Sequence, residues 1–358
     1  MNIHVLDQSF NLIGIIDDYV SSIWRPAYYD VGDFELYLNA SAEAVKLLKK
    51  NRYLVRERDI DVDTQGNVSY SKVMIIKDFT LTTDVEGGDY LTVIGKELKF
   101  LLHQRIVWKQ TTLTGTAENA IRRLVTENAI SPTDSKRVIP TLTLGASAGL
   151  TDTIDKQVTG DHLDQTIVDI CTAYNYGWEI FIYNAALVLI VYQGVDRSFN
   201  QSERPYVVFS EDFDNILNSS YELNSSSYAN TTLIGGEGEG LERIYTTVGD
   251  DKSGLDRFET FTDARDLSRN KDSEDEIPLN TYLLLLQERG RENMAGLGIT
   301  EGFSGEVLDI NFKYGEDYYM GDVVTMINKY GITKDVRVLS AIESMDDTGE
   351  KVIPQFNI

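Results

Sequence analysis

Two segments near opposite ends of the chain carry the same order of features. Residues 23–39, IWRPAYYDVGDFELYLN, hold a Tyr-Tyr pair, a Gly-Asp turn and then an alternating apolar run, and residues 314–327, YGEDYYMGDVVTMI, repeat that order. In the first run Phe34, Leu36 and Leu38 lie on one face, which is the period of a strand. One turn-and-strand device is thus used twice, with no catalytic signature between, and we expect a fold built mainly of sheets.

Composition sets the broad class. Hydrophobic residues make up 42% of the 358 residues, enough for real cores, and this length predicts two to four domains. Acidic residues outnumber basic ones by 57 to 33, for a net charge of -24. Such a chain repels phosphate backbones, so we expect no sequence-specific binding of nucleic acid. Two explanations of the acidic charge stay open: solubility, which is the simpler one, and an acidic wall that nucleic acid passes without binding.

We expect neither a disulfide nor membrane insertion. Cys171 is the single cysteine, which excludes an intrachain disulfide. The N-terminus, MNIHVLDQSF, lacks the charged and apolar regions of a signal peptide. The longest apolar stretch, residues 180–192, is interrupted by Asn184 and is too short to span a bilayer. The sequence therefore predicts a soluble protein made in the cytoplasm.

The first 200 residues divide into a strand-rich part and a mixed part. Across residues 1–100, short apolar runs between polar turns predict strands, with one short helix capped by Ser41. Across residues 101–200, two helices precede a hairpin that turns at Asn184, and Gly177 is placed to end the second helix. The apolar stripes of these two helices are Ala117, Ile121, Leu124 and Val125, and Leu163, Ile167, Ile170 and Tyr174.

The rest of the chain returns to strands around a polar and helical insert. After Pro278 the sequence predicts a helix of about four turns, in which Gly290 is a weak point. We therefore expect an α+β, mostly β fold with two small β-barrel domains. The expected parts are a first barrel (1–100), an α+β insert (101–200), a second barrel (201–250 plus 300–358) and a polar and helical insert (251–299).

The last long strand, KDVRVLSAIES, alternates regularly and leads to a final turn at DDTG, residues 346–349. The alternation is the signal of a strand whose two faces differ. It predicts one face with Val336, Val338 and Ile342 and an opposite face with Arg337, Leu339 and Glu343.

The histidines offer no recognisable metal motif. His4, His103 and His162 lack a spacing such as HExxH, and Cys171 has no CxxC partner. Zinc and thiol chemistry are therefore without support, and we expect neither a metal nor a cofactor. Asp161, His162 and Asp164 do cluster in GDHLDQ, and the simplest interpretation is a polar helix start capped by Asp161.

Two further stretches resemble ligand loops without matching them. In DIDVDTQGN, Asp59, Asp61 and Asp63 alternate, but Thr64 and Tyr70 stand where an EF-hand needs Gly and Glu. A solvated hairpin tip is the default, and weak ion binding stays an alternative. GGEGEG (235–240) lacks both the dinucleotide fingerprint and the P-loop lysine, so a flexible turn is expected. The sequence offers no active site, and we expect no catalytic residue.

Three stretches together resemble one family, the tail hub (baseplate hub-like) proteins of siphophages and related prophages. They are WRPAYYDVGDFELYLN, NTTLIGGEGEGLERIYTTVGDDKSGLDRFETFTDARDL and FKYGEDYYMGDVVTMINKYGITKDVRVLSAIES, in the family's order and spanning nearly the whole chain. The second, with its Gly-Glu-Gly run, Arg243 and RFETFTDARDL, is the most specific. Residues 101–200 match only in type.

The resemblance implies a homotrimer at the distal end of the tail tube, in the tail tip of the virion. Each subunit would supply two barrels, so three copies would place six around a channel and adapt a sixfold tube to a threefold tip. VGDFELYL and MGDVVTMI would be equivalent strand entries, with Gly32 and Gly321 supplying a positive φ or a close backbone approach. Implied partners are the tail tube protein, distal tail protein, tape measure protein and a tail-tip or receptor-binding protein.

Many members of that family continue into a peptidase, a lysin or a receptor-binding extension. This sequence ends at IPQFNI after the last expected strand, so we expect an enzyme or spike to be a separate protein. The alternative function is a carbohydrate-binding adhesin, for which Trp178 and neighbouring tyrosines would stack on sugars. A cell-wall hydrolase is a third candidate, although no acid-nucleophile arrangement supports it.

Overall fold

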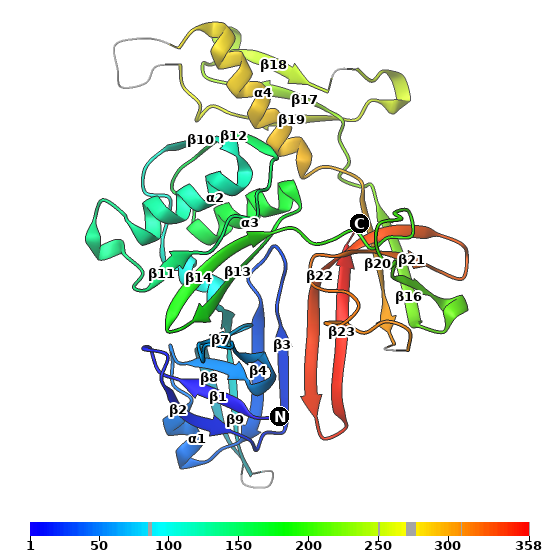
Figure 1. Cartoon of the computed structure of the whole chain (residues 1–358). Coiled ribbons are helices and arrows are strands. Elements are labelled where there is room, and N and C mark those ends of the chain that lie inside the picture. The colour runs from blue at the N-terminus through cyan, green and yellow to red at the C-terminus, as the bar shows by residue number, and fades with distance from the viewer. Residues whose placement is uncertain (85–87, 250, 270–276, 309, 358) are drawn as a thin grey trace. The chain divides into compact units, whose positions relative to one another are not determined.

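The computed structural model describes residues 1–84, 88–249, 251–269, 277–308 and 310–357 (Figure 1). Strands hold 43% of the residues and helices 21%, which confirms a mostly β fold. The chain forms two compact units, one of residues 1–219 with 303–357 and one of residues 220–302. Residues 270–276 of the expected polar insert lie outside the described residues.

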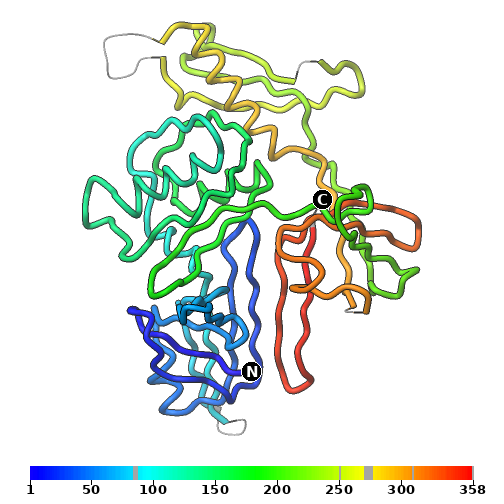
Figure 2. Tube along the Cα trace, viewed as in Figure 1, coloured from blue at the N-terminus to red at the C-terminus, as the bar shows by residue number. Residues whose placement is uncertain are grey.

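The main sheet of the first unit joins strands from both ends of the chain. Its order is β15-β21-β22-β3-β4-β9-β8-β5-β1-β2, and β23 also pairs with β22. Where β3 meets β22, Trp24 lies opposite Glu343, so the blue and the orange-red hairpins of Figure 2 run side by side. The bounds are β1 Ile3–Leu6, β2 Leu12–Ile16, β3 Ser21–Arg25, β4 Asp33–Asn39, β5 Tyr53–Arg56, β8 Met74–Asp84, β9 Gly88–Glu97, β15 Val208–Ser210, β21 Val323–Ile327, β22 Thr333–Asp346 and β23 Gly349–Asn357.

This strand order is an open path. Among the described residues the strands do not close into a barrel, so the two-barrel arrangement is not confirmed and stays a prediction. Local expectations for this part are confirmed. Phe34, Leu36 and Leu38 are buried on one face of β4, and Ser41 caps helix α1 (Ala42–Leu47) by accepting a hydrogen bond from the backbone N of Ala44.

A second group of elements in this unit carries the helices. Helix α2 (Ala117–Val125), followed by a π-helical turn over 126–130, and helix α3 (Leu163–Tyr174) pack their apolar stripes into one core with a five-stranded sheet, β11-β14-β13-β7-β6. Both predicted stripes are buried except at Tyr174, which is half-buried. Asn184 and Ala185 form the hairpin turn with positive φ. The strands are β6 Ile60–Val62, β7 Val68–Tyr70, β10 Thr111–Thr116, β11 Leu142–Leu144, β12 Thr153–Val158, β13 Gly177–Tyr183 and β14 Ala186–Tyr192, with β10 pairing β12.

The ends of helix α3 differ from the expectation. His162, not Asp161, occupies the N-cap position, and no side chain caps the helix there. At the other end Asn175 adopts a left-handed conformation with φ of 57° and ends the helix. Asparagine tolerates this conformation because its short side chain is polar. Gly177 instead begins β13.

A bulge in β22 overturns the expected faces of that strand. The register with β23 runs from Val338 opposite Phe356 to Ser340 opposite Gln355, so Leu339 is the extra residue. One extra residue moves every later side chain to the other face. As a result Ala341 and Glu343 are buried with Val336 and Val338, whereas Ile342 is not.

The second unit is a three-stranded sheet, β18-β17-β19, with one long helix packed on it. The strands are β17 Thr231–Gly235, β18 Tyr245–Val248 and β19 Glu259–Asp263, and the helix is α4 Leu279–Ala295. Gly290 lies against Ile234, where an added Cβ would stand 2.7 Å from the Ile234 side chain. Gly290 is therefore a close-packing position and not merely a weak point. Strands β16 (Ile216–Asn224) and β20 (Thr300–Val307) pair, and the division between the units falls within them.

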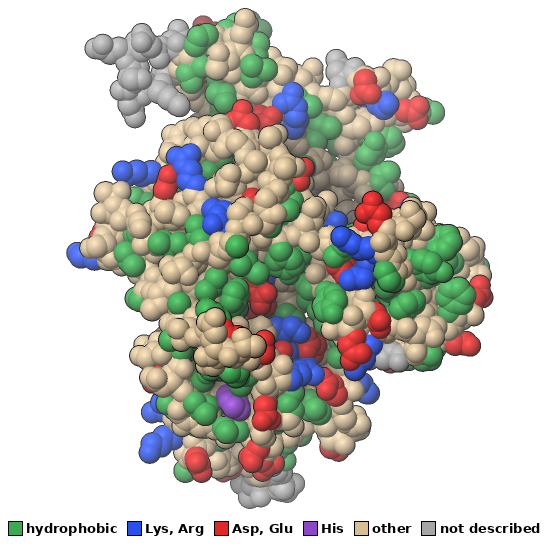
Figure 3. Space-filling view, in the orientation of Figure 1, with side chains coloured by type: hydrophobic (Ala, Val, Ile, Leu, Met, Phe, Trp, Pro, Cys, Tyr) green, Lys and Arg blue, Asp and Glu red, His purple; other side chains and the backbone are tan. Residues whose placement is uncertain are grey.

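Short 3-10 turns connect these elements, at Glu57–Asp59, Leu98–Gln104, Ser135–Arg137, Glu211–Phe213, Gly240–Glu242 and Gly254–Asp256. Among the described residues, no helix combines the length and apolar character that a membrane span requires. On the face shown in Figure 3, acidic and basic side chains are interspersed and do not form separate blocks.

Candidate functional site

Tyr28 joins three parts of the first unit. Its ring is fully buried, and a Cβ added to either Gly177 or Gly321 would stand 2.2 Å from the ring. Its hydroxyl donates to the backbone O of Asn175 at 3.0 Å and accepts from the backbone N of Gly194 at 3.0 Å. These five residues, the Tyr28 junction, hold together segments from the beginning, middle and end of the chain.

The bulge in β22 is part of the same arrangement. The backbone N of Tyr28 donates to the backbone O of the bulged residue, Leu339, at 2.7 Å. Next to it, Tyr29 donates from its hydroxyl to the side-chain O of Asn175 at 2.7 Å. Burial raises the pKa of Tyr29 to about 12, so it stays a neutral donor. Asn175, which ends α3, is thus held by both tyrosines of the Tyr-Tyr pair.

The loop that leads from Tyr28 into β4 is held by a buried charged pair. Lys99 donates to the backbone oxygens of Ala27 and Asp30, and it lies 3.4 Å from the Glu97 carboxylate. Glu97 in turn accepts from the backbone N of Gly32 at 2.8 Å. Because Lys99 and Glu97 are both buried, each needs the other and these backbone groups as partners.

In each of the two Gly-Asp turns the aspartate pairs with an arginine. Asp33 pairs with Arg25 at 2.6 Å, and Asp322 pairs with Arg197 at 2.7 Å. Their glycines serve different purposes. A Cβ at Gly32 would lie 2.3 Å from the backbone O of Arg25, whereas Gly321 has a φ of 87° beside the Tyr28 ring. Both expected roles, close approach and positive φ, are therefore confirmed, one at each turn.

A second connection between the chain ends is ionic. The bulge turns Glu343 toward the interior. Its carboxylate accepts from Arg56 at 2.8 Å, from Arg58 at 2.5 Å and from Lys72 at 2.7 Å. Burial alone would raise the pKa of this carboxyl, but Arg56, Lys72 and Arg58 outweigh it and lower the pKa to about 2. We call these four residues the Glu343 cluster. Arg56 also pairs with Asp59, and Arg58 with Glu350.

The aspartates of the possible ion-binding loop have other partners. Asp59 binds Arg56 in the Glu343 cluster. Asp63 holds a hairpin turn through Asn67 and Tyr183, and hydrogen bonds from the Asn67 side chain and backbone lower the pKa of Asp63 to about 2. In the part of the chain that the structure describes, Asp59, Asp61 and Asp63 do not form a group with metal-ligand spacing.

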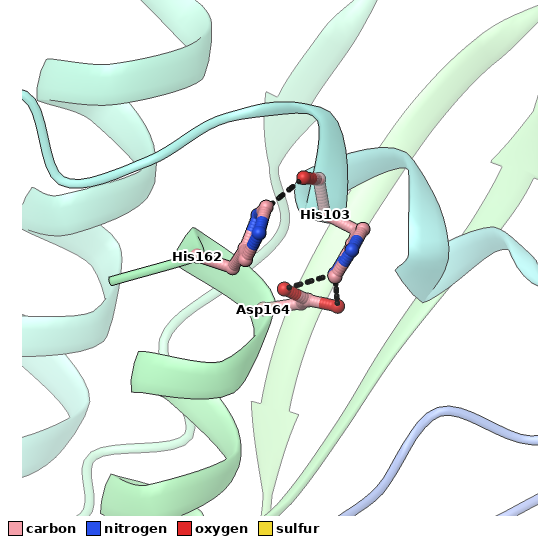
Figure 4. A group of neighbouring side chains, drawn as sticks. All are labelled: His103, His162 and Asp164. Carbon is pink, nitrogen blue, oxygen red and sulfur yellow. Dashed lines mark hydrogen bonds and ion pairs between the residues drawn. The ribbon is translucent and has the colours of Figure 1, made fainter. Parts of the chain in front are cut away.

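A different group does have such spacing, and it includes a residue that sequence reasoning did not connect. His103, at the end of the 3-10 helix Leu98–Gln104, stacks on His162 with ring centroids 3.9 Å apart (Figure 4). Its Nδ1 contacts the two oxygens of Asp164 at 3.0 and 3.2 Å. Asp161 is not part of this group. A separation of 59 residues between the histidines hides it from any local motif.

The glycine-rich turn of the second unit encloses the guanidinium group of Arg243. Arg243 donates to the backbone oxygens of Gly235 and Gly236 at 2.8 and 3.1 Å, and pairs with Asp263 at 2.6 Å. Glu237 is also engaged, since its backbone N donates to the Tyr282 hydroxyl at 2.8 Å. The turn is therefore a built structural feature, formed by carbonyls around a guanidinium.

Two residues considered from sequence are inaccessible. Trp178 is fully buried and donates from its indole N to the backbone O of Tyr29 at 2.7 Å, so it cannot stack on a sugar as the adhesin alternative required. Cys171 is buried as well, and burial raises the pKa of its thiol to about 12, which leaves it unreactive.

The fold is that of phage and prophage tail proteins. It is similar to a tail protein from Neisseria meningitidis MC58 (TM-score 0.57, 13% identity, covering 99% of this chain and 96% of that one) and to the 43 kDa tail protein of prophage MuSo2 from Shewanella oneidensis (0.58, 12%, 100% and 98%). Prophage tail protein gp18 from Listeria monocytogenes EGD-e is also similar (0.51, 12%, 100% and 94%). No curated protein sequence matches the chain.

The family itself is defined by sequence. The model of the Siphovirus ReqiPepy6 Gp37-like protein family matches residues 2–356, and the chain belongs to that family. This confirms the resemblance to a siphophage tail family that the three sequence stretches indicated. The chain is accordingly a phage tail protein, which makes it a component of a virion.

Proposed function

We propose that this protein is the hub subunit of the tail tip, a homotrimer that joins the distal end of the tail tube to the baseplate or tip. In this role it binds the distal tail protein, the tail tube protein, the tape measure protein and a tail-tip or receptor-binding protein. Its role is structural and not enzymatic. It binds no specific nucleic-acid sequence and does not insert into a membrane.

The observation that carries this proposal is the pair of Gly-Asp strand entries. β4 begins at the Asp of its turn and β21 directly after the Asp of its own, each Asp pairs with an arginine, and both strands belong to one sheet. A chain with two similar barrels presents six barrels in a trimer, which matches a sixfold tube to a threefold tip. The proposal includes the two barrels, residues 1–100 and residues 201–250 plus 300–358. The inserts, residues 101–200 and 251–299, would reach outward or toward the tip.

The mechanism follows from the connections between the ends of the chain. A subunit that transmits force around a ring must hold its two sets of strands at a fixed angle. The Tyr28 junction and the Glu343 cluster supply that rigidity through buried contacts. With a net charge of -24, the channel wall is proposed to be acidic, so that DNA slides without binding. A basic wall in an assembled ring would contradict this part.

The adhesin alternative is not favoured, because burial of Trp178 removes its stacking platform. The hub is tested by the solution mass from light scattering, for the protein alone and mixed with the distal tail protein. We expect three times the chain mass of 40.3 kDa, or a complex of three hub chains with six of the partner. A monomer that also ignores the distal tail protein would contradict the proposal.

A further inference from the structure

His103, His162 and Asp164 form a cluster that the hub function does not use. We propose that it is a binding site for a divalent transition-metal ion of the Zn²⁺ type. Each residue offers one ligand atom, and these atoms all lie within 4.8 Å of one another. Two of the ligands come from the start of α3 and the third from the end of the 3-10 helix Leu98–Gln104, so an ion would connect the two elements (Figure 4).

The distances between the ligand atoms suit this chemistry. Two atoms bound about 2.1 Å from a tetrahedral ion lie about 3.4 Å apart. The Nδ1 of His103 already lies 3.0 and 3.2 Å from the two oxygens of Asp164, and an ion bound there would replace the proton that Nδ1 donates to the carboxylate. Only His162 has to approach further, and its side chain is exposed and has room to turn. The proposed site therefore requires the His162 side chain to turn away from its stack on His103.

Before an ion binds, His162 has the tautomer that leaves its Nε2 available to a metal. Its Nδ1 lies 2.8 Å from the backbone O of His103 and donates to it. The Nε2 of the same ring then keeps its lone pair. Donation from the other ring nitrogen to a carbonyl is the usual support of a metal-binding histidine. The two rings stack face to face, with centroids 3.9 Å apart and an angle of 11° between their planes, so one ring has to turn out of the stack before both nitrogens can point at one ion.

The local charges permit a cation, and the donor atoms select its kind. The N-terminus of α3 carries a partial positive charge, which opposes a cation. Asp164, buried at that end of the helix, supplies the compensating negative charge. Two imidazoles and one carboxylate favour Zn²⁺, Co²⁺ or Ni²⁺ over the oxygen-seeking Mg²⁺ and Ca²⁺. Three protein ligands leave a fourth position for water.

The test is calorimetric titration of the full chain with ZnCl₂, in excess MgCl₂ so that the acidic surface is already occupied. We expect one Zn²⁺ per chain, and we expect His162→Ala and Asp164→Asn each to weaken binding by at least about tenfold. His4→Ala is the matched control, because His4 lies outside the cluster, and it should bind like the unaltered chain. Circular dichroism confirms that each variant is folded.

Co²⁺ gives a second readout that does not depend on affinity. Visible d–d bands should appear with the unaltered chain and with His4→Ala, and should be lost with His162→Ala. Two results would overturn the proposal. One is the absence of saturable Zn²⁺ binding to the unaltered chain, and the other is equal Zn²⁺ affinity in His4→Ala and His162→Ala. Neither result bears on the hub, which is tested by solution mass.

Discussion

The Tyr28 junction and the Glu343 cluster connect the same two ends of the chain by different physics. At the Tyr28 junction the contacts are neutral: a buried ring packed against two glycines and two hydrogen bonds of 3.0 Å. At the Glu343 cluster one buried carboxylate binds three cations. Strands from the two ends of the chain are therefore held together by shape at one place and by charge at the other, so the two places should respond to different perturbations.

The largest effect is expected from Glu343→Gln. This change removes one of the two carboxylates that pair with the buried Arg56 and leaves it with Asp59, and breaking a buried ion pair costs about 3–5 kcal/mol in the free energy of unfolding. Urea denaturation at neutral pH measures the loss. Glu350→Gln is the control, because Glu350 contacts the same Arg58 at the surface and should cost less than about 1 kcal/mol. Equal losses from the two variants would mean that the buried charge does not matter.

Acid should weaken the Glu343 cluster and spare the Tyr28 junction. The Glu343 carboxyl has a pKa lowered from 4.5 to about 2, so it stabilises the fold fully above pH 4.5. As the pH falls from about 5 toward 2 this contribution, about 3 kcal/mol, is lost. Unfolding free energies of the unaltered chain and Glu343→Gln should therefore converge at low pH. Parallel curves would show that another group controls the acid response.

Gly321→Ala tests the shape of the Tyr28 junction. The new Cβ meets the Tyr28 ring and also requires a positive φ, so we expect a loss of about 2–3 kcal/mol in unfolding free energy. Gly331→Ala is the matched control: its φ is 78°, but nothing lies within 4 Å of the added Cβ. That variant should lose only about 1 kcal/mol, from backbone strain alone. If both lose the same amount, the ring contact contributes nothing.

Tyr28→Phe should have a smaller effect than Gly321→Ala. It keeps the ring but leaves the backbone O of Asn175 and the backbone N of Gly194 without a partner, for a loss of about 1–2 kcal/mol. Tyr29→Phe removes a single solvent-exposed hydrogen bond to Asn175 and should cost less than about 1 kcal/mol. Thermal unfolding at constant pH compares the pair. A larger effect at Tyr29 would reverse the assignment of the central tyrosine.

Local features of this fold were predictable from the sequence because their causes are local. The N-cap at Ser41 and the turn at Asn184 follow from side chains acting on their own backbone. The buried face of β4 follows from a simple period of two. The whole-chain assignment to a phage tail family rested on three separated stretches, which carry information that no single element does.

What sequence reasoning missed depends on contacts across the chain. The bulge at Leu339 exists where the backbone N of Tyr28 docks, more than 300 residues away, and nothing in KDVRVLSAIES announces it. That single extra residue placed Glu343 inside and Ile342 on the other face. Likewise, the stack of His103 on His162 arises from two elements meeting in space, and the ending of α3 at Asn175 accompanies its contacts with Tyr28 and Tyr29.

The pairing of β3 with β22 also has a consequence in time. During synthesis β3 leaves the ribosome long before β22, because Trp24 and its partner Glu343 are more than 300 residues apart. The edge of β3 therefore stays without this neighbour until β22 has been synthesised. Sheets with such distant contacts fold slowly and expose unpaired edges while they wait. We expect that edge of the nascent chain to need protection from aggregation. Pairing of β22 with β3 is then the folding step that completes the main sheet of the first unit.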